Sequence, residues 1–173
     1  MCAKVVGRHW SFPFAKDASH HLDFWRFEPA GKFYLRRLLQ DDALPNRVEP
    51  KTVLDPILVI IRVAEAIAVG LAISNALELA PESRLGFMFR WKPLRGRRLT
   101  PWANPWVSVS GGHADDNEAT SFVEVPAETP VSAIAPFVDA ATTELFSKFE
   151  GYRFPQAAVE EWCQRLIERR LNA

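Results

Sequence analysis

Residues 55 to 80, DPILVIIRVAEAIAVGLAISNALELA, contain the apolar segment on which the rest of the chain is organised. The Asp55 carboxylate suits the N-cap of a helix, and Pro56 suits the first helical position, where its missing N–H costs little. Pro81 cannot continue a helix. We therefore predict a helix from about Pro56 to Leu79.

Two charged residues, Arg62 and Glu65, interrupt the apolar run. Charges are costly in lipid, so we interpret the segment as a buried helix and not as a membrane span. The two side chains need partners if they face a core. They form either an ion pair at the edge of the buried stripe, since i and i+3 are neighbours on a helix, or the lining of a ligand cavity between helix and sheet.

The composition predicts one soluble globular domain. The chain has 173 residues, of which 48% are apolar and 24% charged, which is ordinary for a domain with its own core. Lys and Arg number 21, and so do Asp and Glu. With no net charge, any electrostatic partner must recognise a local patch, and we expect no membrane binding.

The two cysteines, Cys2 and Cys163, provide neither a disulfide framework nor metal-ligand spacing. A reducing cytoplasm fits this usage. The N-terminal residues MCAKVVGRHWSF lack the apolar core of a secretory signal. We therefore expect a cytoplasmic protein.

Two stretches of similar sequence indicate an internal duplication. Residues 25 to 35, WRFEPAGKFYL, and residues 89 to 99, FRWKPLRGRRL, both place an aromatic-Arg-aromatic triplet before a charged residue, a Pro and a Gly. Pro and Gly are turn formers, so each stretch predicts a β-hairpin. Asp55-Pro56 follows the first stretch along the chain, and Thr129-Pro130 follows the second, as a second helix start.

The predicted fold class is α+β, with duplicated ββα units forming a mostly antiparallel sheet on two long helices. Joining two half-sheets would bury the apolar sheet face and helix stripe that a single hairpin unit leaves exposed. TSFVEV, after residue 119, alternates as a further strand. The single domain divides into an extended arm over 1–21, ββα units over 22–80 and 84–151, and a terminal helix over 155–172.

A run of basic and aromatic residues between 90 and 106 is the strongest surface signal in the sequence. Guanidinium groups contact phosphates and indole rings stack on bases, as in single-stranded nucleic-acid binding faces. Ordinary exposed strand positions explain the same residues equally simply. The candidate binding residues are Arg90, Lys92, Arg95, Arg97, Arg98 and Trp102, together with Arg62 and Glu65.

No catalytic motif is present: the chain has no nucleophile elbow, P-loop or dinucleotide-binding glycine motif, and we expect no cofactor. The loop that holds His113, Asp115 and Asp116 is a weak metal candidate, because imidazole and carboxylates can meet there. Another acidic set could bind Mg²⁺ as in a nuclease. Its members are Glu28, Asp41 and Asp42. Polar turns account for both groups as well.

The segments LDFWRFEPAGKFYLRRLLQDD and VLDPILVIIRVAEAIAVGLA resemble the C-terminal region of bacterial Schlafen-type AlbA and ATP-binding proteins. That class is expected to carry its nucleotide or nucleic-acid machinery in an N-terminal domain, which nothing in this chain matches. The resemblance implies an accessory or sensor domain and carries over no functional residue.

We therefore expect a non-enzymatic domain of a bacterial intracellular protein that binds a partner or a ligand. Two alternatives are a single-stranded nucleic-acid-binding module that uses residues 90–106 and a metal-dependent hydrolase or nuclease. A homodimer is a further expectation, because the edges of a two-hairpin sheet can pair with a second chain.

Overall fold

Short antiparallel sheets and helices make up the computed structural model, which describes residues 4–6, 9–12, 23–28, 31–109 and 111–171. The predicted α+β class is confirmed. The chain divides into two compact units, residues 1–50 and residues 51–173. The boundary lies inside the stretch 22–80 that was predicted as the first ββα unit.

The first unit contains a four-stranded antiparallel sheet in the order β1-β2-β3-β4. A hairpin joins β3 (Asp23–Glu28) to the edge strand β4 (Lys32–Arg37), as predicted, and Gly31 adopts a φ of +82° in the turn. Glycine suits this turn because its missing Cβ permits positive φ. The other elements are β1 (Lys4–Val6), β2 (His9–Phe12) and the short helix α1 (Gln40–Ala43).

Strands β1 and β2 lie in the stretch predicted as an extended arm, where they pair with each other. Residues 1–3, 7–8 and 13–21 of that arm lie outside the described part of the chain. The described part of the arm is therefore strand that belongs to the sheet, since β2 also pairs with β3.

The second unit contains an antiparallel pair of eight-residue strands, β6 (Arg84–Trp91) and β8 (Ala119–Pro126). The strand predicted at TSFVEV is thus confirmed as β8. The predicted second hairpin is wrong: β6 does not return through residues 97–99 but pairs with a strand that begins 28 positions after Trp91. The duplicated ββα unit is accordingly not confirmed.

The predicted PLRG turn is present, but the residues that follow it do not pair with β6. Gly96 has a φ of +80°, and the Arg97 amide donates to the Leu94 carbonyl at 2.9 Å. The chain then enters β7 (Arg98–Leu99), which pairs in parallel with β5 (Val53–Leu54). A parallel pair cannot be closed by a tight turn, so this contact connects the start of the second unit to its middle.

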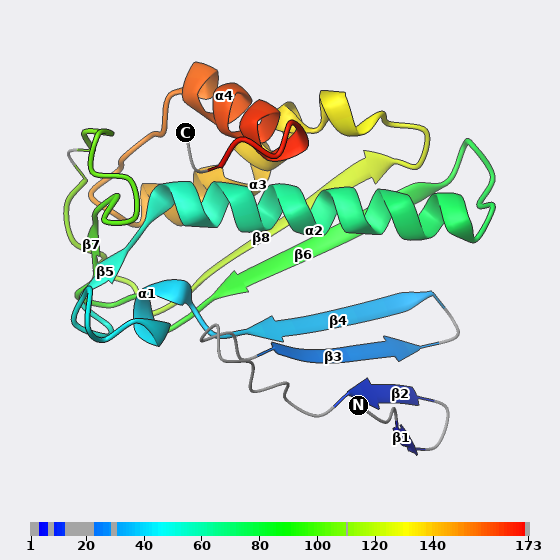
Figure 1. Ribbon diagram of the computed structural model, residues 1–173, viewed down its shortest axis with the longest axis horizontal. Helices are drawn as coiled ribbons and strands as arrows, with labels where there is room; N and C mark the ends of the chain where they lie inside the picture. Colours follow the sequence, from blue (N-terminus) through cyan, green and yellow to red (C-terminus); the bar gives the residue numbers. More distant parts are fainter. Residues whose placement is uncertain (1–3, 7–8, 13–22, 29–30, 110, 172–173) are drawn as a thin grey trace. The chain divides into compact units, whose positions relative to one another are not determined.

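Three helices cover one face of the β6–β8 pair (Figure 1). Helix α2 (Pro56–Ala76) packs against β6, and α3 (Ala135–Ser147) packs against β8. Helix α4 (Gln156–Ile167) packs on α2 and α3 as an outer layer. Gly70 lets α2 approach the sheet closely, since a Cβ there would lie 2.6 Å from the Phe87 ring. The second unit is therefore a sheet with helices on one side.

Helix α2 is long and apolar enough, by length and composition, to cross a membrane, with a mean hydropathy of 2.3 over its most apolar window. Of that window, 44% is buried within the protein. Ile60, Ala64 and Ile67 are fully enclosed. Such burial is typical of a core helix, which agrees with the interpretation made from Arg62 and Glu65.

The helix expected after Thr129 and Pro130 begins later than predicted. A 3-10 turn, η1 (Val131–Ala133), comes first, and the Thr129 amide closes a turn on the Pro126 carbonyl at 3.0 Å. Helix α3 has 13 residues against 21 in α2, so two long helices are not confirmed. The terminal helix ends at Ile167 instead of near residue 172.

The N-cap predicted at Asp55 is confirmed, and the same side chain also binds a distant loop. One carboxylate oxygen accepts from the amides of Ile57 at 2.9 Å and Leu58 at 3.3 Å. The other accepts from the Ala103 amide at 2.9 Å. Asp55 is fully buried, and its hydrogen bonds secure both the start of α2 and the loop after β7.

We predict that Asp55→Ala lowers the free energy of unfolding by about 2–4 kcal/mol, since it removes a helix cap and leaves the Ala103 amide without its acceptor. Urea denaturation followed by circular dichroism measures this. Asp115→Ala, at an exposed loop position, is the control and should stay within about 0.5 kcal/mol of the parent. Equal losses in both variants would contradict the role of Asp55.

Candidate functional site

The two faces of the β6–β8 pair differ sharply, because successive residues of a strand point to opposite sides. On the helix side, the rings of Phe87, Phe89 and Trp91 stack along β6, with centroids 6.4 Å and 5.8 Å apart. Val123 and Val125 of β8 are buried on that side. This face forms the core of the second unit.

The opposite face exposes two large apolar side chains at its centre. Met88 and Phe122 are directly opposite each other in the register, with 74% and 58% of their surface exposed. The Phe122 ring also leans over Gly86, where a Cβ would lie 3.1 Å from it. We call this surface the open face; it comprises Arg84, Gly86, Met88, Arg90, Glu118, Thr120, Phe122 and Glu124.

Ion pairs bracket the apolar centre of the open face. Arg84 donates to Glu124 at 3.3 Å on one side, and Arg90 donates to Glu118 at 2.6 Å on the other. The hydrogen bond from Arg90 lowers the pKa of the Glu118 carboxyl group below its usual value. Both cations are on β6, whereas both anions are on β8 or immediately before it. The face is therefore divided into a basic and an acidic strand.

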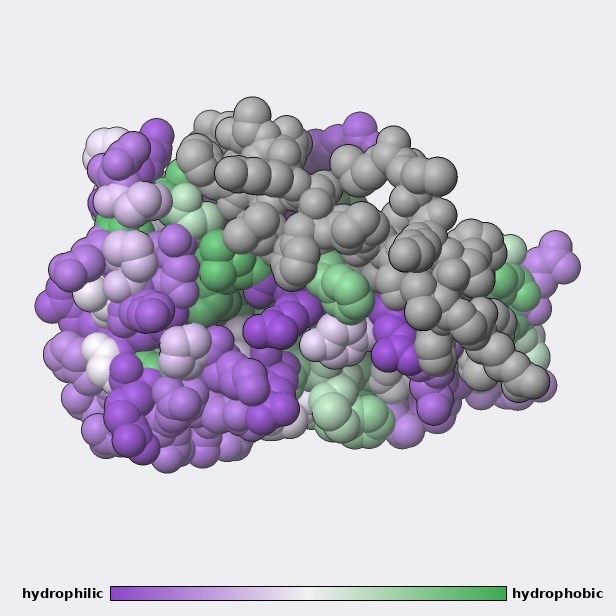
Figure 2. All heavy atoms as spheres, turned by 90° about the horizontal axis from the view of Figure 1, so that it is seen from below, coloured by the Kyte–Doolittle hydropathy of each residue, from purple (hydrophilic) through white to green (hydrophobic). Residues whose placement is uncertain are grey.

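Seen from below the view of Figure 1, the surface is largely hydrophilic, and hydrophobic side chains gather in a few patches (Figure 2). Scattered apolar side chains are normal on protein surfaces. A pair of large apolar residues framed by ion pairs on a regular sheet is less ordinary, because contiguous apolar patches with a polar rim are typical of interaction sites.

The basic residues between 90 and 106 do not form one surface. Arg97 has only 1% of its surface exposed, and its guanidinium donates to the carbonyls of Pro93 at 2.7 Å and Val53 at 2.8 Å. Arg97 thus ties the PLRG turn to β5. Arg95 is exposed and donates to the Asp115 carbonyl at 3.0 Å.

Lys92 and Arg98, two other members of that run, are exposed, while Trp102 is half-buried. Trp106 is almost completely exposed, at 93%. The run therefore supplies several separate surface groups and one structural arginine, and the burial of Arg97 depends on a carbonyl 44 residues away.

Arg62 and Glu65 form an ion pair on α2. Their side chains approach to 2.8 Å, and each is about one-third exposed. This geometry matches the simpler of the two interpretations, a pair at the edge of the buried stripe. Neither residue lines the two cavities beside α4.

The metal candidates do not converge in the described residues. The His113 amide donates to Glu150 at 3.2 Å, and Asp116 pairs with Lys148 at 3.1 Å. Hydrogen bonds to Glu144 and Asp116 raise the pKa of Lys148. Among residues 4–6, 9–12, 23–28, 31–109 and 111–171, no three His, Cys, Asp or Glu side chains are grouped as a metal site would require.

The acidic set of Glu28, Asp41 and Asp42 also has local structural roles. Glu28 pairs with Arg26 at 3.2 Å. Asp41 is buried in the first turn of α1, and Asp42 beside it is half-buried. An acidic residue in the first turn of a helix interacts favourably with the helix dipole.

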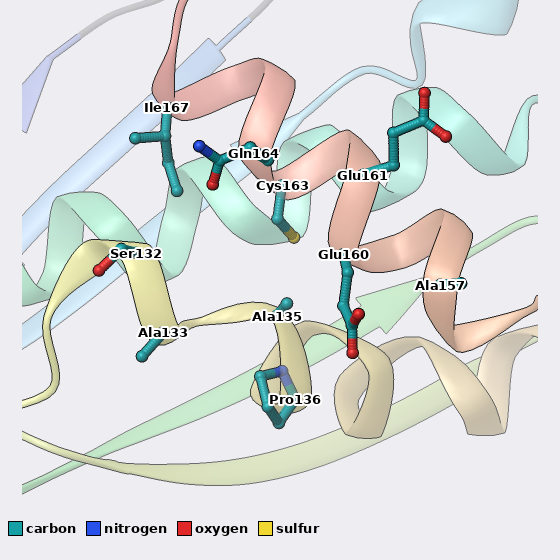
Figure 3. Close-up of a pocket in the computed structure, with 10 residues that line it drawn as sticks. All are labelled: Ser132, Ala133, Ala135, Pro136, Ala157, Glu160, Glu161, Cys163, Gln164 and Ile167. Carbon is teal, nitrogen blue, oxygen red and sulfur yellow. The ribbon is translucent and has the colours of Figure 1, made fainter.

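A shallow groove of about 570 Å³ lies between η1, the start of α3 and α4. Cys163 is at its base, and Figure 3 shows the sulfur pointing toward Ala135, with the Glu160 carboxylate beside Pro136. Burial, and secondarily the charge of Glu160, raises the pKa of the Cys163 thiol to about 11. The thiol is therefore protonated at neutral pH and is a poor nucleophile.

We predict that Cys163 is alkylated slowly in the native protein. A pKa of about 11 instead of 9.0 leaves about 100-fold less thiolate at pH 8, so iodoacetamide should react at least 100-fold more slowly than in urea. The rate is measured by mass spectrometry in a Cys2→Ser background. A native rate within tenfold of the denatured one would contradict the burial of this thiol.

The open face is not among the surfaces predicted from the sequence. Alternation in FMF and in TSFVEV already separates Met88 and Phe122 from their buried neighbours. What was missing was the pairing of β6 with β8, without which the two residues belong to unrelated segments.

Comparisons of the chain with protein-family models, with curated proteins and with solved structures give no match.

Proposed function

We propose that the protein is a non-enzymatic accessory domain that binds a protein partner through the open face. The observation that carries the proposal is the exposed Met88–Phe122 pair at the centre of a sheet whose other face is the core. Apolar anchors at the centre of a patch, with polar groups that exclude water around them, are the usual arrangement of energetic hot spots.

The rigidity of the sheet supports this proposal. Phe87 and Phe89 pack between the strand and the helices, so the backbone under Met88 is held in place. Binding to a preformed surface loses less conformational entropy than ordering a loop would. The ion pairs of Arg84 and Arg90 set the orientation of a partner more than its affinity.

The resemblance to the C-terminal region of Schlafen-type AlbA and ATP-binding proteins agrees with an accessory or sensor role. In that setting the domain would work in the bacterial cytoplasm, beside catalytic or nucleic-acid-binding machinery elsewhere. The duplicated ββα unit is retained only as a hypothesis of origin: an antiparallel strand pair precedes a helix with an early Pro at both α2 and α3.

We predict that Met88→Thr with Phe122→Thr abolishes capture of a partner from native cell extract while the domain stays folded, because both side chains are exposed and Thr suits a strand. Affinity capture with quantitative mass spectrometry measures the loss, and thermal melting checks the fold. The matched control, Leu77→Thr with Leu79→Thr, changes two exposed apolar residues after α2 and should capture normally. If the parent captures a partner and both variants capture it equally well, the proposal is refuted.

One observation favours single-stranded nucleic-acid binding as a second candidate. Trp106 is 93% exposed and is in the same segment as exposed Lys92 and Arg98, so its ring is available to stack on a base. Fluorescence anisotropy with a labelled oligothymidylate tests this. If nucleic acid is the ligand, Trp106→Ala should weaken binding about tenfold or more, as loss of one stacking contact does. Absence of binding by the parent protein at low salt removes this candidate.

A further inference from the structure

We propose that the partner of the open face is a second copy of this chain, bound about a twofold axis parallel to strands β6 and β8. This inference rests on the proposed function, since it names the occupant of the same surface. It is carried by the distribution of charge on the face, which is complementary to itself under one specific rotation.

The face has a simple layout. Arg84 and Arg90 are near the two ends of β6, with Met88 between them. Glu124 is opposite Gly86 on the neighbouring strand and Glu118 immediately precedes that strand, so each carboxylate lies diagonally across from the arginine it pairs with, and Phe122 is between the two carboxylates. The register places Met88 opposite Phe122, so the apolar pair is at the centre of the pattern.

A twofold axis parallel to the strands places β6 of one copy opposite β8 of the other across the interface. Met88 of each copy then contacts Phe122 of its partner, and at both ends each arginine lies next to the strand position of a carboxylate of the partner. An Arg guanidinium has five N–H donors, so Arg84 can keep Glu124 of its own copy and bind the equivalent carboxylate across the interface. Each end therefore becomes a cluster of alternating charges.

The other twofold axis in the plane of the face is unfavourable. An axis perpendicular to the strands would place β6 of one copy over β6 of the other, so the basic strand of each copy would face the basic strand of its partner. Like charges in close contact destabilise an interface. The segregation of charge by strand thus selects one arrangement, as expected for an isologous contact between identical surfaces.

The size of the face predicts a weak dimer. Two paired strands of eight residues measure about 27 Å by about 10 Å, from a rise of about 3.4 Å per residue and a strand spacing of about 4.8 Å. This is well below the roughly 800 Å² per partner of a stable interface. Association should therefore depend on concentration and be visible only when the protein is concentrated.

Sedimentation equilibrium of the full chain tests the proposal. The average mass should rise from 19.6 kDa toward twice that value as concentration increases, and Met88→Thr with Phe122→Thr should hold it at 19.6 kDa. A parent protein that stays monomeric at millimolar concentration overturns the second copy as partner. The capture experiment still decides the proposed function in that case, so the two failures are distinguishable.

Charge reversal tests the direction of the axis. An acidic variant carries Arg84→Glu with Arg90→Glu, and a basic variant carries Glu118→Arg with Glu124→Arg. Each variant alone should be monomeric, because its two strands bear the same charge, whereas an equimolar mixture should form a heterodimer. A monomeric mixture, or self-association of either variant as strong as that of the parent, overturns the arrangement. Circular dichroism confirms that each variant is folded before mixing.

Discussion

The buried Asp55 carboxylate is the contact on which the second unit depends. It accepts hydrogen bonds from the first turn of α2 and from the Ala103 amide, so it joins the core helix to the long connection between β6 and β8. Parallel pairing of β5 with β7 brings these segments together from positions far apart in sequence. A buried carboxylate is tolerated because its charge is satisfied by several donors.

Arg97 has the complementary role at the same junction. Its guanidinium spans from the Pro93 carbonyl to the Val53 carbonyl, and it is almost fully enclosed. Basic residues in sequence are easily interpreted as a binding surface, yet here one of them stabilises a turn. The planar, multidentate guanidinium suits such carbonyl contacts better than a lysine would.

The open face is a consequence of the same architecture. Helices α2, α3 and α4 gather on one side of the β6–β8 pair, and the other side retains Met88 and Phe122 at the surface. Two strands alone bury little, so the sheet depends on the helices for its stability. Rigid backing and an apolar centre between ion pairs together make this surface suitable for a partner.

Local sequence was enough to predict elements whose signals are local. The Asp55-Pro56 cap, helix α2, the β3–β4 hairpin and strand β8 were all predictable, because capping, turn chemistry and alternation operate over a few residues. The ion pair of Arg62 and Glu65 follows equally from their spacing on a helix.

Only the tertiary structure decided which strands pair. FRWKPLRGRRL has the turn chemistry of a hairpin, but β6 pairs with β8, and the residues after the turn pair with β5. Strand pairing depends on the burial of side chains from distant segments, which overrides the local turn preference. The burial of Arg97 and the meeting of Met88 with Phe122 follow from that choice, and so no local pattern could reveal them.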